Sequence, residues 1–332
     1  MTITITGAAG FLGQRMMRLL AARGERLVLT DMHALPTPPP PNATVLTGPL
    51  ERLLPQAITE DTTAVVHLAA VVSAGAEADF DLGYAVNLTT LQAVLERCRE
   101  VRSRPKLLFT SSLAVFGAID VATDASACQP SSSYGTQKAI GELLVNDYSR
   151  KGFVDGRTLR LPTVSIRPGK PNKAASGFAS GILREPLAGK PAVCPVSPEA
   201  ELWLGSPASV SRAMLHALDL PAAAFSEVGT RGLPPTQWRT LNVPGISVRV
   251  AEMVAALGRA GGDTKLLTFE RDPAIEAIVG SWPRRFETER AHAMGFAPAE
   301  DIDAAIQSHL AETLEPATAA WPPVGTLVYD FF

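Results

Sequence analysis

The sequence predicts an α/β fold, a doubly wound parallel sheet accompanied by a smaller C-terminal α+β lobe. Short runs rich in β-branched residues alternate with amphipathic segments of helix length through the first half of the chain. This alternation is typical of a parallel sheet covered on both faces. The length of 332 residues exceeds that of one compact domain, which favours a second lobe.

The expected strands of the sheet are short and separated by helices. Apolar residues recur at three- and four-residue spacing between them, as in an amphipathic helix. The run of prolines at 36–41 fits neither a helix nor a central strand, so we expect a surface connection there. We predict strands at residues 2–6, 26–30, 44–46, 64–68, 106–110 and 158–166, and helices at 12–22, 84–101 and 134–151.

The regular alternation stops after Ile166, where the chain becomes rich in glycine and proline. Loops of this composition often close over a site. Helices are expected at 247–258 and 300–314, with a short strand at 264–269. We therefore predict a sheet domain formed by residues 1–167, to which 205–245 return, and a second lobe formed by 168–204 and 246–332.

Composition and charge exclude several classes of protein. The net charge is −3, the isoelectric point is about 6.0, and the basic residues are scattered, so no nucleic-acid partner is expected. Cys98, Cys128 and Cys194 are odd in number and widely spaced, which predicts neither a disulfide framework nor a metal site. The sequence has no long apolar block, so we expect no membrane span and a cytoplasmic location.

A glycine-rich turn follows the first expected strand. In the stretch Gly7-Ala8-Ala9-Gly10-Phe11-Leu12-Gly13, the glycines permit a tight turn, a close approach of backbone amides to a pyrophosphate, and close packing of the next helix. A tight turn alone is the alternative interpretation. Asp31, at the end of the second strand, favours dinucleotide binding, because a carboxylate there accepts both ribose hydroxyls and repels the extra phosphate of NADP. The sequence thus predicts a Rossmann domain that binds NAD.

The fourth strand ends in small residues that would let a dinucleotide cross the sheet edge. They are Ala69 and Ala70, which follow Leu68. His67 lies just before Leu68. A histidine near a strand end is more often packed and hydrogen-bonded than catalytic, so we expect no catalytic role for His67.

Tyr134 and Lys138 are four residues apart, so both lie on one face of the expected helix. A free phenol has a pKa of about 10, and it becomes a base near neutrality only when an ammonium and a positive nicotinamide ring stabilise the phenolate. A strand ending in Ser111 and Ser112 offers a hydroxyl that would bond the substrate oxygen beside the tyrosine. Tyr134, Lys138 and one of these serines are therefore the expected catalytic residues.

The stretch Ser111-Ser112-Leu113-Ala114-Val115-Phe116-Gly117 is similar to the SSxxVYG motif of the extended short-chain dehydrogenases/reductases, the group of the NAD-dependent sugar epimerases and dehydratases. The resemblance implies that Ser112 is the active serine and that Pro162, Thr163 and Val164 lie near the nicotinamide carboxamide. Asn87 matches the asparagine of that group, with an amide on a helix face as the alternative. The chain departs from the pattern at Pro49, where an aspartate usually reaches adenine, which leaves the amide of Leu50 for that contact.

The stretches 69–80, 161–172 and 178–187 resemble the D-erythronate dehydrogenase subfamily, whose members oxidise the C2 hydroxyl of a four-carbon sugar acid with NAD. The segment 199–205 is acidic and apolar, which would make a poor clamp for the diphosphate of a nucleotide sugar. Arg160, inside a strand, is expected to pack or pair. The candidate substrate contacts are Ser73, Ser112, Arg167, Asn172 and Ser176.

Two other functions fit the same sequence features. A nucleotide-sugar epimerase or dehydratase would use the same residues with tightly bound NAD, and a non-catalytic dinucleotide sensor would keep only the fold. The resemblance also implies a homodimer, because the helices that correspond to 84–101 and 134–151 often pair across a two-fold axis in this group.

Overall fold

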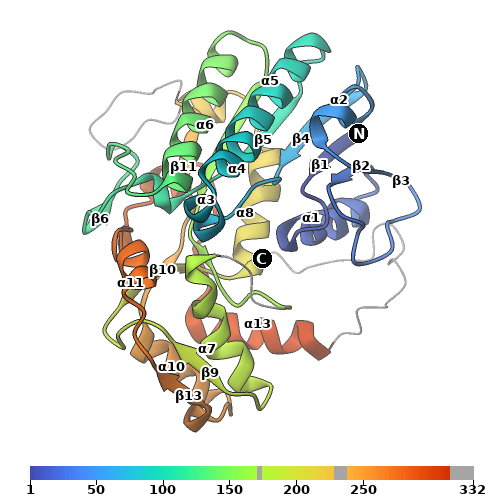
Figure 1. Cartoon of the computed structure of the whole chain (residues 1–332). Helices are drawn as coiled ribbons and strands as arrows, with labels where there is room; N and C mark the ends of the chain where they lie inside the picture. The colour runs from blue at the N-terminus through green and yellow to red at the C-terminus, as the bar shows by residue number, and fades with distance from the viewer. Residues whose placement is uncertain (170–173, 228–237, 315–332) are drawn as a thin grey trace.

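The computed structural model describes residues 1–169, 174–227 and 238–314, which form two lobes (Figure 1). The upper lobe in Figure 1 holds a sheet of seven parallel strands in the order β11-β7-β5-β4-β1-β2-β3. This confirms the predicted doubly wound α/β fold. The strands are β1 (Thr2–Thr6), β2 (Arg26–Asp31), β3 (Ala43–Thr47), β4 (Thr62–His67), β5 (Lys106–Ser112), β7 (Asp155–Leu161) and β11 (Thr240–Asn242).

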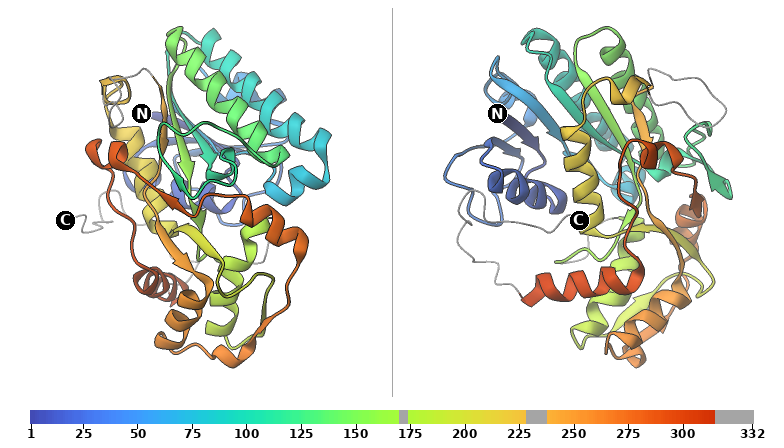
Figure 2. Two further views of the ribbon diagram at one scale, coloured as in Figure 1. Left: turned by 90° about the vertical axis from the view of Figure 1, so that its left-hand side faces the viewer. Right: turned by 180° about the vertical axis from the view of Figure 1, so that it is seen from behind.

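Helices cover both faces of this sheet. On one face, α2 (Leu50–Ala57), α5 (Thr90–Glu100) and α6 (Ser133–Arg150) pack their apolar residues against Val65, Leu107 and Phe109. On the other face, α1 (Phe11–Ala22) and α8 (Pro207–Asp219) lie side by side, which is best seen from behind (Figure 2). The chain thus returns to the sheet lobe at α8 and β11, after it has entered the second lobe.

The second lobe is a mixed α and β structure below the sheet (Figures 1 and 2). It has its own apolar core, which includes Trp203, Met253 and Trp282. A three-stranded sheet in the order β12-β10-β8 joins the lobe to the end of β7. The elements of the second lobe are β8 (Thr163–Val164), α7 (Phe178–Leu187), β9 (Ala192–Cys194), β10 (Glu201–Gly205), β12 (Ile246–Arg249), α10 (Val250–Arg259), β13 (Leu267–Phe269), α11 (Pro273–Gly280) and α13 (Ile302–Leu314).

Short elements connect these parts of the chain. They are α3 (Ser73–Ala78), α4 (Phe80–Tyr84), β6 (Val121–Ala122), α9 (Ala224–Glu227), β14 (Arg285–Phe286), α12 (Glu289–Ala293) and single turns at Leu113–Val115, Ala175–Gly177 and Thr264–Leu266. The proline run at 36–41 contains neither helix nor strand, as the sequence predicts. Within the described ranges, no helix combines the length and the apolar character that crossing a bilayer requires.

The single strand predicted at 158–166 is wrong, because two strands of different sheets occupy it. β7 ends at Leu161 and pairs with β5 and β11, whereas β8 begins at Thr163 and pairs with β10. Pro162 separates them, since proline has no N–H to donate to a strand ladder.

Three other boundaries also differ from the prediction. The helix expected at 84–101 contains a π-helical turn at Ala85–Thr89 before α5 begins. The helix expected from residue 247 begins instead at Val250, because Ile246–Arg249 pairs with β10 and Glu252 caps the helix by accepting a hydrogen bond from the Arg249 amide. The strand expected at 264–269 opens with a 3₁₀ turn and is extended only from Leu267.

Candidate active site

The glycine-rich turn joins β1 to α1 at the carboxyl edge of the sheet. Gly7 has a φ of 70°, and a Cβ on it would lie 2.7 Å from the amide nitrogen of Ala69. A Cβ on Gly13 would lie 2.3 Å from the carbonyl oxygen of Gly7. Only glycine fits at these two positions, and the bare backbone leaves the start of α1 open to a pyrophosphate.

Asp31 ends β2 beside this turn. Its Oδ2 accepts a hydrogen bond from the amide of Ala9 at 2.9 Å, and its Oδ1 accepts one from the amide of His33 at 3.0 Å. A carboxylate oxygen has a second lone pair, so both oxygens can still accept from ribose hydroxyls. The side chains and backbone at this edge therefore fit an NAD molecule, with the turn at its pyrophosphate and Asp31 at its adenosine ribose.

The predicted catalytic pair, Tyr134 and Lys138, lies in the first turns of α6. Ser132 caps this helix, because its Oγ accepts a hydrogen bond from the amide of Gly135 at 3.1 Å. Lys138 is buried, its Nζ donates to the carbonyl of Thr110 at 2.9 Å, and it lies 5.7 Å from the centre of the Tyr134 ring. Ser112, the last residue of β5, shares a hydrogen bond with Tyr134. The structure thus brings all three predicted catalytic residues together.

Burial shifts the pKa of each member of the pair. It raises the pKa of Tyr134 to about 12, although the Ser112 hydrogen bond and the charge of Arg167 lower it. It lowers the pKa of Lys138 to about 8, against the opposing effect of Glu142. The Tyr134 phenol therefore needs more positive charge than Lys138 supplies in this geometry before it can act as a base near neutral pH.

A cavity of about 300 Å³ lies between the glycine turn, the ends of β4 and β5, and the second lobe. Most of the predicted site residues, although distant in the sequence, line this one space. They are Gly7, Gly10, Phe11, Leu12, Gly13, Leu68, Ala70, Ser73, Ser112, Tyr134, Lys138, Pro162, Thr163, Val164, Arg167 and Ser176.

Other predicted residues lie outside the lining. Asp31 and Ala69 flank the glycine turn. Leu50 begins α2, and its side chain is part of the apolar core. Asn87 is buried, and its amide donates to the Val71 carbonyl at 2.9 Å and accepts from the Val71 amide at 2.8 Å, so it holds the chain that follows β4. Asn172 lies outside the described residues.

Arg167 enters the cavity from the segment after β8. Its backbone is held on both sides, because its amide donates to Ser180 Oγ at 3.0 Å and its carbonyl accepts from Arg184 at 2.7 Å. Its guanidinium has no hydrogen-bond or ion-pair partner among the described residues. Ser73 also lines the cavity, and its Oγ accepts a hydrogen bond from the amide of Ala175 at 3.1 Å, which links the sheet lobe to the second lobe.

Several lining residues are not among the predicted ones. Thr110 and Ser111 belong to the strand end that the sequence does mark, but Trp282 lies outside every stretch that the sequence analysis singles out. Its Nε1 is buried and has no partner among the described residues. No local pattern identifies this residue, because only the packing of the second lobe brings it to the cavity. The others are Val72, Leu113, Leu161 and Ala174.

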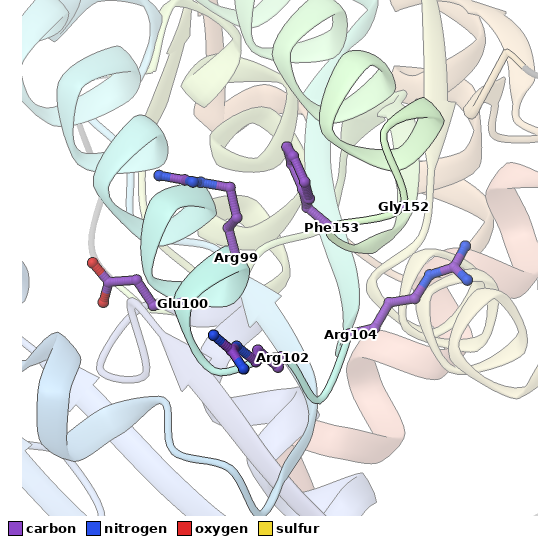
Figure 3. A pocket seen from close by; sticks show the side chains of 6 residues that line it. All are labelled: Arg99, Glu100, Arg102, Arg104, Gly152 and Phe153. Carbon is purple, nitrogen blue, oxygen red and sulfur yellow. The ribbon is translucent and has the colours of Figure 1, made fainter.

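His67 and a second hollow take no part in this site. His67 Nδ1 lies 2.8 Å from Thr6 Oγ1, and burial lowers the pKa of the imidazole to about 3, which confirms that the ring is packed and hydrogen-bonded. The second hollow, of about 590 Å³, lies near the start of β5, at the end remote from Ser112. The guanidinium groups of Arg99, Arg102 and Arg104 point in different directions there (Figure 3), so they offer no common anion site.

Comparison with known proteins now places this site in a family. The model of the NAD dependent epimerase/dehydratase family matches residues 3–228, and the chain belongs to that family. It is an oxidoreductase, and its cofactor is NAD.

Two relatives with assigned names match nearly the full length of the chain. The chain is 49% identical over 327 residues to a D-erythronate dehydrogenase of Cupriavidus necator, covering 93% of this chain and 98% of that protein. It is 45% identical over 322 residues to a D-erythronate dehydrogenase of Haemophilus influenzae, covering 93% and 99%. A crystal structure described as a nucleoside-diphosphate-sugar epimerase from Agrobacterium tumefaciens superposes with a TM-score of 0.82 at 36% identity, covering 95% and 94%.

The Gly13→Ala variant tests the glycine turn. We expect NADH affinity to fall at least tenfold, because the added Cβ meets the Gly7 carbonyl and displaces the turn. Titration followed by NADH fluorescence measures this. The matched control is Gly181→Ala, in α7, where an added Cβ has nothing within 4 Å. Equal affinities for both variants would contradict the assignment of the turn to the pyrophosphate.

Proposed function

We propose that this enzyme oxidises the C2 hydroxyl of a small sugar acid, of the type of D-erythronate, to the 2-keto acid with NAD, and that Tyr134 is the general base. The two relatives named above share nearly the full length of the chain, which supports a sugar acid as the substrate class. The geometry of the cavity supports the same class.

The observation that carries the proposal is the placement of Arg167 beside Tyr134. The guanidinium is close enough to lower the pKa of the phenol, and no described residue neutralises it. An arginine binds a carboxylate through two parallel hydrogen bonds. In a 2-hydroxy acid the carboxylate is bonded to the carbon that carries the hydroxyl, so a carboxylate on Arg167 would bring the C2 hydroxyl towards Tyr134.

The described side chains divide the reaction among them. Ser112 would hydrogen-bond the C2 oxygen, and Tyr134 would remove the proton of that hydroxyl while the C2–O bond becomes a carbonyl. Lys138 would hold positive charge near the phenolate. When bound, NAD supplies the acceptor for the hydride that leaves C2. Ser73 and Ser176, which both line the cavity, are the proposed contacts for the remaining hydroxyls.

A screen of aldonic acids tests the reaction. We expect NADH absorbance at 340 nm to accumulate with four-carbon acids and free NAD, and Tyr134→Phe to lower kcat by at least a hundredfold, because it removes the base. A purified enzyme that retains NAD and yields no net NADH would instead indicate an epimerase or dehydratase. Full cellular function of the Tyr134→Phe variant would indicate a dinucleotide sensor.

Replacement of Arg167 by Met tests the carboxylate contact. We expect kcat/KM for the acid to fall by about 10- to 150-fold, the loss that corresponds to a charged hydrogen bond of about 1.5–3 kcal/mol. NADH affinity should stay unchanged. Arg150→Met, which removes an exposed cation of α6 paired with Asp147, is the control. An unchanged KM and kcat for the acid in the Arg167 variant would refute the contact.

We also propose that the chain forms a homodimer through the face of α4, α5 and α6. Phe80 and Leu82 on α4 and Leu143 on α6 are large apolar side chains that are 56%, 47% and 59% exposed, and α4 packs against α6 (Figure 1). A second copy would cover them across a two-fold axis.

Sedimentation velocity at micromolar concentration tests the dimer. We expect twice the mass of the chain for the native protein and the monomer mass for Leu143→Glu, because the charge would be buried at the interface. A monomer for the native protein at that concentration would refute the proposal. Val193→Glu, on the exposed side of β9, is the control and should leave the dimer intact.

A further inference from the structure

Glu142 continues the row of catalytic side chains along α6. Tyr134, Lys138 and Glu142 follow one another at four-residue intervals and therefore share one face of the helix. The Glu142 side chain is only 1% exposed. A buried carboxylate is costly unless it is paired and hydrogen-bonded, so its partners indicate what it does.

Arg160 of β7 is the charge partner. Its Nε donates to Glu142 Oε1 at 2.9 Å, and its Nη2 donates to Oε2 at 2.7 Å. This two-point contact fixes the plane of the carboxylate. It also confirms the expectation that Arg160 pairs within the protein.

Ser111 connects this ion pair to the catalytic strand. Its Oγ donates to Glu142 Oε1 at 2.5 Å. Ser111 stands between Thr110, whose carbonyl accepts the hydrogen bond of Lys138, and Ser112, which bonds Tyr134. The strand end that carries both contacts is thus fastened to Glu142, one helical turn beyond Lys138.

We propose that Glu142, held by Arg160, is a positioning residue for the reaction: it fixes the end of β5 against α6 through Ser111 and keeps the Lys138 ammonium charged. The inference rests on the proposed roles of Tyr134 and Lys138. The proposal has two components, the hydrogen bond from Ser111 to Glu142 and the effect of the Glu142 charge on Lys138. Different substitutions remove them separately.

Among the described residues, Glu142 is the anionic group that acts on Lys138, from one helical turn further along α6. The other titratable groups near Lys138 are Tyr134 on α6 and His67 on β4, and the pKa of about 3 makes His67 neutral at working pH. Around Glu142 lie Arg160 and the thiol of Cys128, whose pKa is raised by burial, and the charge of Asp124 also acts on Arg160. Since Glu142 raises the pKa of Lys138, its neutralisation lowers that pKa further below about 8.

The decisive variant is Glu142→Gln, assayed as kcat against pH with an aldonic acid and NAD. We expect the alkaline limb of the profile to move down by about one pH unit, so that the rate on that limb falls about tenfold, because Lys138 loses its proton at lower pH. Glu142→Asp keeps the charge but shortens the reach, so its kcat should fall while the limb stays in place. Asp147→Asn, which removes an exposed charge from the same helix, should leave the profile unchanged.

Ser111→Ala removes the hydrogen bond between Ser111 and Glu142 without altering any charge. We expect kcat to fall several-fold while the alkaline limb of the pH profile stays in place. Thermal unfolding shows whether Glu142→Gln folds. If it does not fold, Ser111→Ala is the variant that tests the proposal. A folded Glu142→Gln enzyme with the native limb, or a Ser111→Ala enzyme with the native kcat, would overturn the inference. A native enzyme that yields no NADH with any acid would instead defeat the proposed function.

Discussion

The buried hydrogen bond between Lys138 Nζ and the Thr110 carbonyl is the contact on which the site depends. Burying an ammonium group costs free energy because the group loses its hydration. Proteins offset this cost with hydrogen-bond acceptors and an opposite charge at fixed positions. α6 must therefore approach β5 closely. Two glycines of α6 permit this, because a Cβ on Gly141 would lie 2.7 Å from the Phe109 ring of β5, and one on Gly135 would lie 2.1 Å from the carbonyl of Ala114 in the turn that follows β5.

Close packing has an electrostatic consequence. Burial moves the pKa of the Tyr134 phenol up and that of the Lys138 ammonium down, so both shifts favour the neutral forms. The surroundings oppose these shifts from two directions. Glu142, one helical turn further along the same face of α6, acts on Lys138, while Ser112 and Arg167 act on Tyr134 from the cavity. The charge of Arg167 lowers the pKa of Tyr134, and Arg167 lies in the segment that follows β8. The pKa of the phenol therefore depends on where the second lobe holds that segment.

The sequence made the sheet lobe predictable because its signals are local. The glycine turn, the carboxylate at the end of β2 and the spacing of Tyr134 and Lys138 each depend on a few neighbouring residues, and the structure places them around the same sheet edge. The prediction failed where contacts between distant segments decide. The extended segment 246–249 is a strand because β10 is available to pair with it, and Trp282 reaches the cavity only through the packing of its lobe.

The sequence by itself determined the first five strands of the sheet, the glycine turn and the spacing of Tyr134 and Lys138, because backbone sterics and helix periodicity act over a few residues. The tertiary structure alone decided which buried charges face one another. Glu142, Arg160 and Ser111 belong to three separate elements, and their mutual contacts depend on how α6 crosses β5 and β7. Electrostatic coupling depends on distance in space and on exclusion of water, and neither quantity is written in the order of residues.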